Sequence, residues 1–390
     1  MPSISLSSVN ITFLGTASAQ PSSTRNHSSL ALRLGGDVWL FDCGEATQHQ
    51  IQRSSVKMGN ISKIFITHTH GDHIFGLGPL LASRLNGAGG MVAGVHDPRE
   101  QELVAQDQPV VEIYGPSGTR AYVRSALVYS HTLLGAPYVV HELHDAREPL
   151  LPESNLPLNA SELPHGQDMP IDAESNTWPI ICKDALVQVS AAPIHHSVPC
   201  VGFVVSELPV PGKMDPALYI PHLKRTKSPM SLLSRLQGGE TVELSDGTVL
   251  TGPGRRPGRK IVILGDTHDP SPIADLALDC DILVHEATNA HLPDVDSNTK
   301  STDTHESVEE RTKSRGHSTP QMAGKFATRV KARKLVLNHF SARYAGDEDV
   351  NEESRNIMGA IKSLAESEYL GGEVLCARDL WGFDIPISSS

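Results

Sequence analysis

The sequence predicts a mixed α/β protein in which buried strands carry chemically active residues near their C-terminal ends. Short apolar runs rich in Val and Ile recur along the chain, and their length and composition are those of buried strands. Each run carries, or is closely followed by, a His or an Asp near its C-terminal end. The five runs are residues 61–67, 186–192, 261–267, 281–288 and 334–340.

The first run leads into a dense group of metal ligands. Residues 67–73 read Thr-His-Thr-His-Gly-Asp-His, which places His68, His70, Asp72 and His73 within six positions. Two His separated by one residue can close on one ion, while Asp72 and His73 turn back toward a second. Imidazole and carboxylate suit Zn²⁺ better than Mn²⁺ or Fe. A His-rich surface loop or a structural zinc site is the alternative, but structural sites usually include Cys.

Two metal ions need more ligands than one loop supplies, and the other runs offer them. Residues 186–192 lead to His195 and His196, and the next run carries Asp266. The last two runs carry His285 and His339. Any one of these residues alone would more often be structural, but their repetition at strand ends predicts that they converge on one site.

The composition predicts one globular protein without a membrane segment. Of the 390 residues, 39% are hydrophobic, and no apolar run reaches transmembrane length. The N-terminus lacks a signal-peptide core and an Arg-rich transit pattern. Five scattered Cys, an odd number, favour free thiols in a reducing compartment. We therefore expect a cytoplasmic or nuclear protein, and the sequence does not exclude an organelle.

Three segments depart from the pattern of a compact core. Residues 86–109 are Gly-rich and then polar, and residues 145–179 are rich in Pro and acidic residues. Residues 293–313, rich in Ser, Thr, Asp and Glu, lie between two of the site strands. We interpret all three as surface insertions. The third is positioned to influence substrate access, although a solvated loop is the simpler interpretation.

The net charge is −12, but the chain contains two basic segments, at 215–240 and at 255–260. No acidic residue lies between Asp215 and Glu240, a stretch that contains Lys224, Arg225 and Lys227. Local positive charge of this kind attracts polyanions such as nucleic acid, whatever the total charge. A solvated basic loop is the alternative.

Several motifs together resemble ribonuclease Z, the tRNA 3′-processing endonuclease of the metallo-β-lactamase superfamily, in its short form. Beyond the metal loop, the matching motifs are Gly-Glu-Ala-Thr-Gln at 44–48, His-Glu-Ala-Thr at 285–288 and His-Phe-Ser-Ala-Arg-Tyr at 339–344. The resemblance covers most of the chain. It implies a four-layer αββα sandwich formed by residues 1–390 as a single domain. The implied activity is zinc-dependent removal of the 3′ trailer from precursor tRNA, leaving a 3′-hydroxyl on the tRNA and a 5′-phosphate on the trailer.

The resemblance also implies two zinc ions per chain. In the family pattern, a Pro and a Gly follow one His ligand by three and six residues, and Pro199 and Gly202 satisfy this only for His196. His195 is then a neighbour rather than a ligand. The expected ligands are His68, His70 and His196 for one ion, Asp72, His73 and His339 for the other, and Asp266 between the two.

Three catalytic residues follow from the same resemblance. Asp72 is expected to orient or deprotonate the attacking water. His285 is expected to protonate or stabilise the leaving 3′ oxygen, with Glu286 tuning it. Asp42 is expected to support a ligand His rather than to bind metal.

The RNA-binding residues are expected mainly in a protruding arm at residues 207–237. In the family such an arm clamps the tRNA, so Lys224, Arg225 and Lys227 are candidates for phosphate contacts. The family tends to form homodimers, in which one subunit's arm presents RNA to the other subunit's site.

Two further segments are candidates for contact with the RNA. His317, Ser318 and Thr319 precede a predicted helix at 320–330, where they offer a hydroxyl and helix N-terminal amides to a phosphate, or serve as a plain helix cap. Relatives carry a Lys that touches the RNA 3′ end where this chain has Ser23. Arg25 is the expected substitute, and this difference bears on discrimination against a terminal CCA.

Two other function classes share parts of this pattern. A metal-dependent phosphodiesterase or arylsulfatase acting on small substrates would use the same metal loops but would not need a basic arm. A non-catalytic RNA-binding protein with this fold would be expected to have lost metal ligands, and none is missing.

Overall fold

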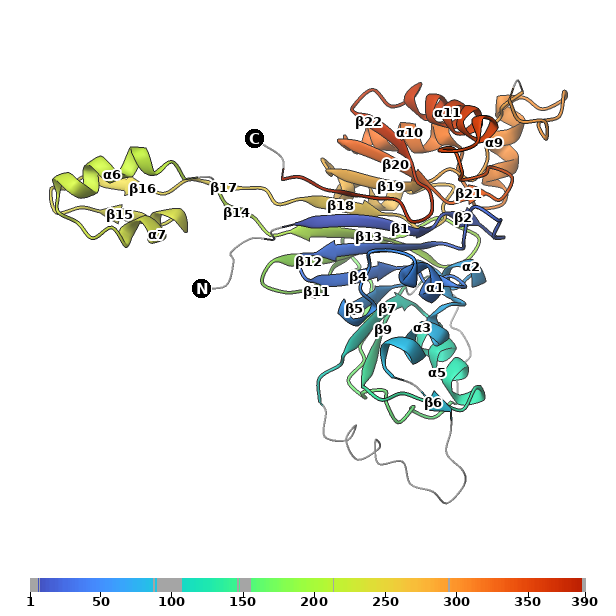
Figure 1. Cartoon of the computed structure of the whole chain (residues 1–390), viewed down its shortest axis with the longest axis horizontal. Helices are drawn as coiled ribbons and strands as arrows, with labels where there is room; N and C mark the ends of the chain where they lie inside the picture. The colour runs from blue at the N-terminus through green and yellow to red at the C-terminus, as the bar shows by residue number, and fades with distance from the viewer. Residues whose placement is uncertain are drawn as a thin grey trace, which may run out of the picture.

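The computed structural model describes residues 6, 8–86, 88–89, 107–145, 147, 156–212, 214–293 and 295–387. Two β-sheets pack face to face, and helices cover the outer face of each sheet (Figure 1). The predicted four-layer αββα sandwich is therefore confirmed. None of the helices in these ranges has both the length and the apolar composition needed to cross a membrane.

The first sheet has eight strands and the second has seven. In spatial order, the first consists of β10 (Asp168–Pro170), β9 (Tyr138–His144), β7 (Val111–Pro116), β5 (Ile61–Phe65), β4 (Asp37–Phe41), β3 (Ser29–Leu34), β1 (Val9–Gly15) and β23 (Gly382–Asp384). The second consists of β11 (Trp178–Lys183), β12 (Val187–Ile194), β13 (Cys200–Glu207), β18 (Lys260–Ile263), β19 (Ile282–Glu286), β20 (Lys334–Asn338) and β22 (Glu373–Cys376).

Four strand pairs lie outside the two sheets: β2 (Ala17–Ser18) with β21 (Phe340–Ser341), β6 (Ala88–Gly89) with β8 (Thr132–Leu133), β14 (Val210–Pro211) with β17 (Arg255–Arg256), and β15 (Thr241–Glu243) with β16 (Val249–Thr251). The α-helices are α1 (Thr47–Gln52), α2 (Gly71–Ile74), α3 (Leu77–Arg84), α5 (Thr119–Tyr129), α6 (Pro216–Arg225), α7 (Leu232–Gln237), α8 (Ala274–Ala277), α9 (His305–Lys313), α10 (Pro320–Arg329) and α11 (Glu352–Glu366), and the short 3₁₀ helices are η1 (Met58–Asn60) and η2 (Ser271–Ile273).

The apolar runs of the sequence are strands buried on both faces. In β20, Leu335 and Leu337 pack toward α10 and α11, whereas Val336 packs into the core between the two sheets. That inner core includes Phe65 and Phe203, one from each sheet, with ring centroids 5.3 Å apart. A strand covered on both sides reads as a continuous hydrophobic run rather than an alternating one, which is why these strands were predictable.

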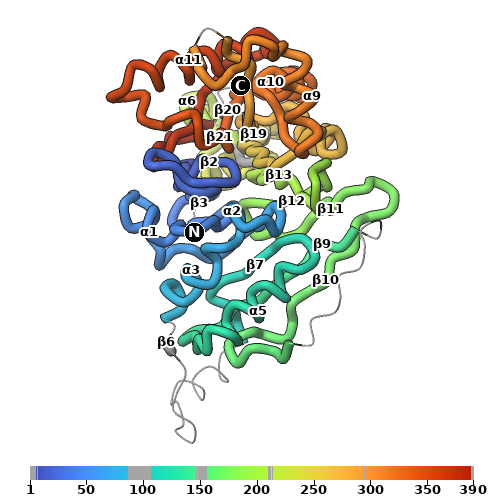
Figure 2. Tube along the Cα trace, turned by 90° about the vertical axis from the view of Figure 1, so that its right-hand side faces the viewer, coloured from blue at the N-terminus to red at the C-terminus, as the bar shows by residue number. Residues whose placement is uncertain are grey.

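The strand ends bring the candidate site residues to one end of the sandwich. Strands β4, β5, β7 and β9 run parallel in the first sheet, and β18, β19 and β20 run parallel in the second. Their C-terminal ends meet at the end that Figure 2 views, where α2, β2 and β21 lie between α3 and α5 on one side and α9 to α11 on the other. The loops that leave these strands therefore face one another across the two sheets.

Arg25 is part of the protein interior. Its side chain is 1% exposed, and its Nε donates to the carbonyl of Tyr344 at 2.7 Å. Its Nη1 donates to Thr16 Oγ1 at 2.7 Å and to the carbonyl of Ala377 at 3.0 Å, and the guanidinium lies 4.6 Å from the centre of the Phe340 ring. The prediction that Arg25 contacts the RNA is therefore wrong. The residue ties the N-terminal loop to the chain that follows β21.

An arm projects from the sandwich, and it is longer than the predicted segment at residues 207–237. Instead of ending near residue 237, the protruding unit runs from β14 to β17 and contains α6, α7 and the β15–β16 hairpin (Figure 1). It has its own small core, formed by Leu223, Leu236, Val242, Leu244 and Leu250. The charge pattern marked only its first half, because Glu240, Glu243 and Asp246 lie in the hairpin.

The three predicted insertions have different outcomes. Most of 86–109 lies outside the described residues. In 145–179, residues 146 and 148–155 lie outside them, but the remainder holds β10, which is the edge strand of the first sheet and pairs with β9, and the start of β11. Residues 293–313 contain α9, whose Thr304 side chain caps the helix and whose Val308 is buried. The interpretation of this third segment as a solvated loop is therefore wrong for its second half.

Replacing Arg25 by Met should lower the free energy of unfolding by about 3 kcal/mol or more, because several buried acceptors lose a charged donor. Urea denaturation at fixed metal content measures this. Arg33→Met is the matched control, since the Arg33 side chain is 45% exposed and 3.8 Å from its partner Asp384, and it should cost less than about 1 kcal/mol. Equal losses in the two variants would contradict the role given to Arg25.

Candidate metal centre

One group of predicted ligands forms a cluster at the end of the sandwich. His68 Nε2 lies 3.1 Å from His70 Nδ1, and His196 Nε2 lies 3.3 Å from the same atom. Asp266 Oδ2 is 3.7 Å from His68 Nε2 and 3.9 Å from His196 Nε2. These four side chains come from both sheets, and their ligand atoms all lie within 4.8 Å of one another.

The remaining predicted ligands form a second cluster beside the first. His73 Nε2 and His339 Nε2 are 3.1 Å apart, and Asp72 Oδ2 lies 3.6 and 3.4 Å from them. Asp266 Oδ1 lies 3.4 Å from His73 Nε2 and 3.3 Å from His339 Nε2. Asp266 thus directs one carboxylate oxygen to each cluster, as expected for a bridging ligand.

The spacing within each cluster fits a metal ion. Ligand atoms placed about 2.0–2.1 Å from a tetrahedral zinc lie roughly 3.3 Å from one another. The distances of 3.1 to 3.9 Å match this value. The set of imidazoles and carboxylates without thiols is also that of a catalytic zinc site rather than a structural one.

The hydrogen bonds of the imidazoles support the same conclusion. The His73 Nδ1 proton goes to Asp42 Oδ2 at 2.6 Å, as predicted for Asp42, and the His196 Nδ1 proton goes to the carbonyl of Gly316 at 2.8 Å. His339 Nδ1 lies 3.2 Å from Thr288 Oγ1, and this hydroxyl donates its own proton to Glu286 Oε2 at 2.6 Å. With Nδ1 engaged in this way, each ring can present an Nε2 lone pair to its cluster. Converging lone pairs repel one another unless a cation lies between them.

Asp266 remains ionised in this environment. Burial alone would raise its pKa, but the imidazoles of His339, His73 and His68 outweigh burial and hold the pKa of Asp266 well below its ordinary value. The carboxylate is 2% exposed, so its charge is compensated by the groups around it rather than by water.

The candidate proton donor is His317 and not His285. Consecutive residues of β19 point to opposite faces, so Glu286 faces the metal clusters while His285 faces away. His285 is fully buried, bonds through Nδ1 to the carbonyl of Glu286 at 2.8 Å, and packs beside Phe326. The predicted catalytic role of His285 is therefore wrong. Sequence reasoning missed this role for His317, although the alternation within β19 was a usable signal.

His317 lies between the two clusters with Glu286 behind it. Its Nδ1 is 3.1 Å from Glu286 Oε1 and 3.8 Å from Asp266 Oδ2, and the side chain is 17% exposed. Burial alone would lower the pKa of His317, but the carboxylates of Glu286 and Asp266 outweigh it and raise the pKa to about 9. The two carboxylates therefore favour the protonated ring, and with Nδ1 facing Glu286 the Nε2 atom is available to a bound molecule.

The two residues after His317 have structural roles. Ser318 Oγ donates to the carbonyl of Thr267 at 2.6 Å, and Thr319 is the N-cap of α10. Their exposures are 0% and 1%. Both hydroxyls are engaged within the protein, so the alternative of a plain helix cap describes Thr319 better than a phosphate contact through its hydroxyl. His195 is exposed and belongs to neither cluster, in agreement with the choice of His196.

Known proteins share this fold and much of this sequence. The family model for the anti-Pycsar protein Apyc1 matches residues 9–88. The metallo-beta-lactamase fold protein YhfI from Bacillus subtilis has a TM-score of 0.53 at 14% identity and covers 97% of this chain and 99% of its own. The chain is therefore a protein of the metallo-β-lactamase fold.

More similar relatives identify the family. The human zinc phosphodiesterase ELAC protein 1 is 37% identical over 97% of this chain and 99% of its own length. Ribonuclease Z of Synechococcus sp. strain WH7803 is 34% identical over 97% of this chain and 96% of its own. The crystal structure of human tRNase Z, short form, has a TM-score of 0.59 at 32% identity and covers 97% of this chain and 100% of that one. The chain belongs to the ribonuclease Z family, and its His and Asp clusters are those of a metal-dependent enzyme.

Replacing Asp266 by Ala should release metal from both clusters, because both lose the same bridging ligand. Elemental analysis after dialysis measures this. Asp269→Ala is the matched control, since this carboxylate follows the same strand but bonds to the amide of Ser271, and it should keep the wild-type metal content. An Asp266→Ala protein that retained its full metal content would refute the bridging assignment.

Proposed function

We propose that this protein is a zinc-dependent endoribonuclease that removes the 3′ trailer from precursor tRNA. Two adjoining ligand clusters that share the Asp266 carboxylate are the observation that carries the proposal, together with membership of the ribonuclease Z family. The projecting arm argues against the alternative of a phosphodiesterase or arylsulfatase specialised for small substrates, since such an enzyme would not need it.

We infer that each chain holds two zinc ions, one in each cluster. When bound, the ions supply a water that is activated near neutral pH and positive charge opposite the phosphate. Asp72 orients the attacking water: its Oδ2 accepts a hydrogen bond from the amide of Ala19 at 2.7 Å, which fixes the carboxylate toward the second cluster.

The role of proton donor to the departing 3′ oxygen is best filled by His317. Glu286 holds its Nδ1 proton, so the proton on Nε2 is the one that can be transferred. Cleavage breaks the bond between phosphorus and the 3′ oxygen, which takes this proton and leaves a 3′-hydroxyl on the tRNA. The phosphate remains on the 5′ end of the trailer.

The arm is proposed to bind the tRNA body. Lys224 and Lys227 are exposed, and no ion pair within the described residues involves either of them. Arg225 is also exposed, but it pairs with Asp246 at 2.7 Å and so joins α6 to the β15–β16 hairpin. Lys224 and Lys227 are thus the better candidates for phosphate contacts.

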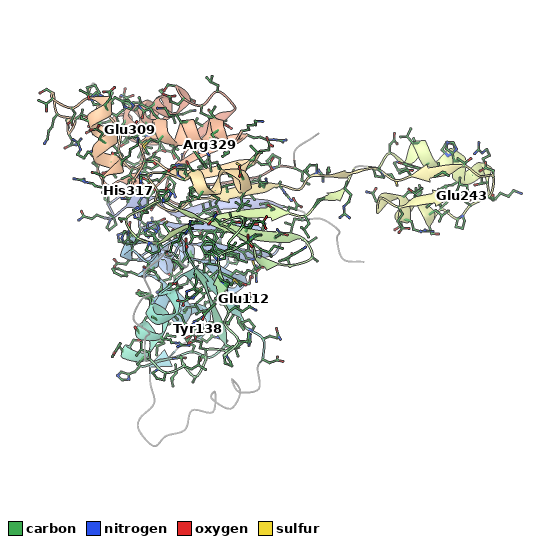
Figure 3. All side chains as sticks on the ribbon, turned by 180° about the vertical axis from the view of Figure 1, so that it is seen from behind. Glu112, Tyr138, Glu243, Glu309, His317 and Arg329 are labelled. Atoms are coloured by element: carbon green, nitrogen blue, oxygen red, sulfur yellow. The ribbon has the colours of Figure 1, made fainter. Side chains whose placement is uncertain are left out.

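The position of the arm supports the proposed homodimer. Figure 3 shows Glu243 in the arm and His317 at the metal centre at opposite ends of the molecule. An arm that points away from its own site fits the proposal that it presents RNA to the site of another copy. The five Cys are free thiols, which fits the proposed location in the cytoplasm or nucleus and is compatible with an organelle.

Incubation with a 3′-extended precursor tRNA, followed by mapping of both new ends, tests the function. We expect one cut after the discriminator nucleotide, with a 3′-hydroxyl and a 5′-phosphate at the new ends, abolished by a chelator and restored by zinc. A protein that cleaves small phosphodiesters but leaves this RNA intact would refute the proposal.

Replacing His317 by Ala should lower kcat for precursor tRNA by about 10²–10⁴-fold, because the leaving oxygen loses its proton donor. The same change at His285 should leave kcat per metal-loaded, folded molecule close to the wild-type value. Single-turnover cleavage at matched metal content measures both. The reverse order of effects would return the role to His285.

Replacing Lys224 and Lys227 together by Ala should raise KM for precursor tRNA and flatten the salt dependence of RNA binding. Each lost phosphate contact contributes about 0.7–0.9 to the log–log slope, so the slope should fall by about 1.4–1.8. Lys183 and Lys331, both exposed on the body of the protein, are the matched control pair. An equal change in both double variants would show that total charge, and not the arm, is responsible.

A further inference from the structure

An exposed aromatic side chain lies against the loop that carries the metal ligands. Phe75 follows α2, and its ring packs on Gly71, where an added Cβ would come within 2.3 Å of Phe75 Cε2. Gly71 separates the ligands His70 and Asp72, so the ring lies one residue from each of them. The Phe75 side chain is nevertheless 58% exposed.

A second ring extends this surface. Tyr122 of α5 lies nearly parallel to Phe75, with the ring centroids 6.3 Å apart and an interplanar angle of 15°. Its neighbour Val123 is buried in the core beneath the first sheet, which anchors this part of α5. We call Phe75 and Tyr122 the aromatic platform. It consists of two nearly parallel rings, one attached to the metal loop and the other to a helix.

Packing alone does not account for the exposure of Phe75. Ile74, Leu77 and Leu80 from the same segment are fully buried and fill the core beneath the sheet, while Phe75 points outward. The two rings alone are far smaller than a stable protein interface, which buries roughly 800 Å² on each side. A small flat ligand is the better match.

We propose that the aromatic platform stacks an unpaired nucleobase beside the scissile phosphate. This inference rests on the proposed function and adds a recognition element to it. Aromatic side chains are the usual partners of unpaired RNA bases, since every base has a π-face to stack. A base stacked on Phe75 would be held next to the loop that carries His70 and Asp72, and its phosphate would then lie close to the metal clusters.

Stacking also suits an enzyme that must accept many precursors. It tolerates any base, whereas hydrogen-bond readout of base edges selects one. The platform would therefore position the chain at the cut without imposing a sequence on the trailer.

A double-mutant cycle between protein and RNA tests the proposal. Phe75→Leu keeps an apolar cover over Gly71 but removes the π-face. With intact precursor tRNA, kcat/KM should fall about tenfold, the scale of one lost base–aromatic stack. Two further RNAs are each made abasic at one of the two nucleotides that flank the cut. With the RNA that lacks the stacked base, the same substitution should have little effect. Phe75→Tyr should restore the wild-type value.

The test has one control variant and two outcomes that would contradict the proposal. Leu370→Ala removes an apolar side chain that is 89% exposed in the turn before β22, and it should not distinguish the RNAs. Equal losses for Phe75→Leu on the intact RNA and on both abasic RNAs would overturn the proposal. So would a change of oligomeric state in sedimentation, which would make Phe75 a protein contact. If the wild type removed no trailer, the proposed function itself would fail, and the dissociation constants of the same RNAs would still test the platform.

Discussion

The shared carboxylate of Asp266 is the interaction on which the arrangement of the site depends. Its two oxygens face two His clusters, and the ligands of those clusters come from both sheets. The carboxylate reaches this position because Gly265 passes closely between the sheets. A Cβ at Gly265 would lie 2.6 Å from Thr67 Cβ and 2.7 Å from Cys200 Sγ, so only glycine allows the approach. The closeness of the two sheets at this point therefore sets the geometry of the centre.

Around Asp266, three of the imidazoles are held by an oxygen atom on the side away from the carboxylate. Asp42 holds His73, Thr288 holds His339, and Glu286 holds His317. Asp42 and His339 adopt left-handed backbone conformations, with φ of 60° and 54°, which non-glycine residues adopt at a cost. Local strain of this kind is typical of functional sites, where the surrounding fold fixes the direction of a side chain. Here it turns side chains at strand ends inward, toward the shared carboxylate.

The strands and the ligand set were predictable because each rests on a local pattern. A strand buried on both faces appears in the sequence as an apolar run, and the ligands of the metal loop can be recognised from the spacing His-x-His-x-Asp-His. The errors came from contacts between distant segments. Nothing near Arg25 in the sequence shows that its guanidinium bonds to carbonyls more than 300 positions away. Similarly, the assignment of His285 followed the motif and overlooked the alternation of β19, which directs Glu286 to the site. The arm was underestimated because the prediction followed positive charge, whereas its second half is a hairpin held by apolar packing.

The attachment of the arm has a mechanical consequence. The arm has its own apolar core, and within the described residues the strand pairing at its base is the β14–β17 ribbon, in which two residues of each strand are paired. A ribbon this narrow resists bending far less than a sandwich of two packed sheets does. We therefore expect the arm to move as a rigid unit about the ribbon. Thermal motion should change the angle between the arm and the sandwich more readily than the internal structure of the arm. Such a joint lets a rigid binding surface follow the curvature of the molecule it holds, while the chemistry at the opposite end of the protein remains undisturbed.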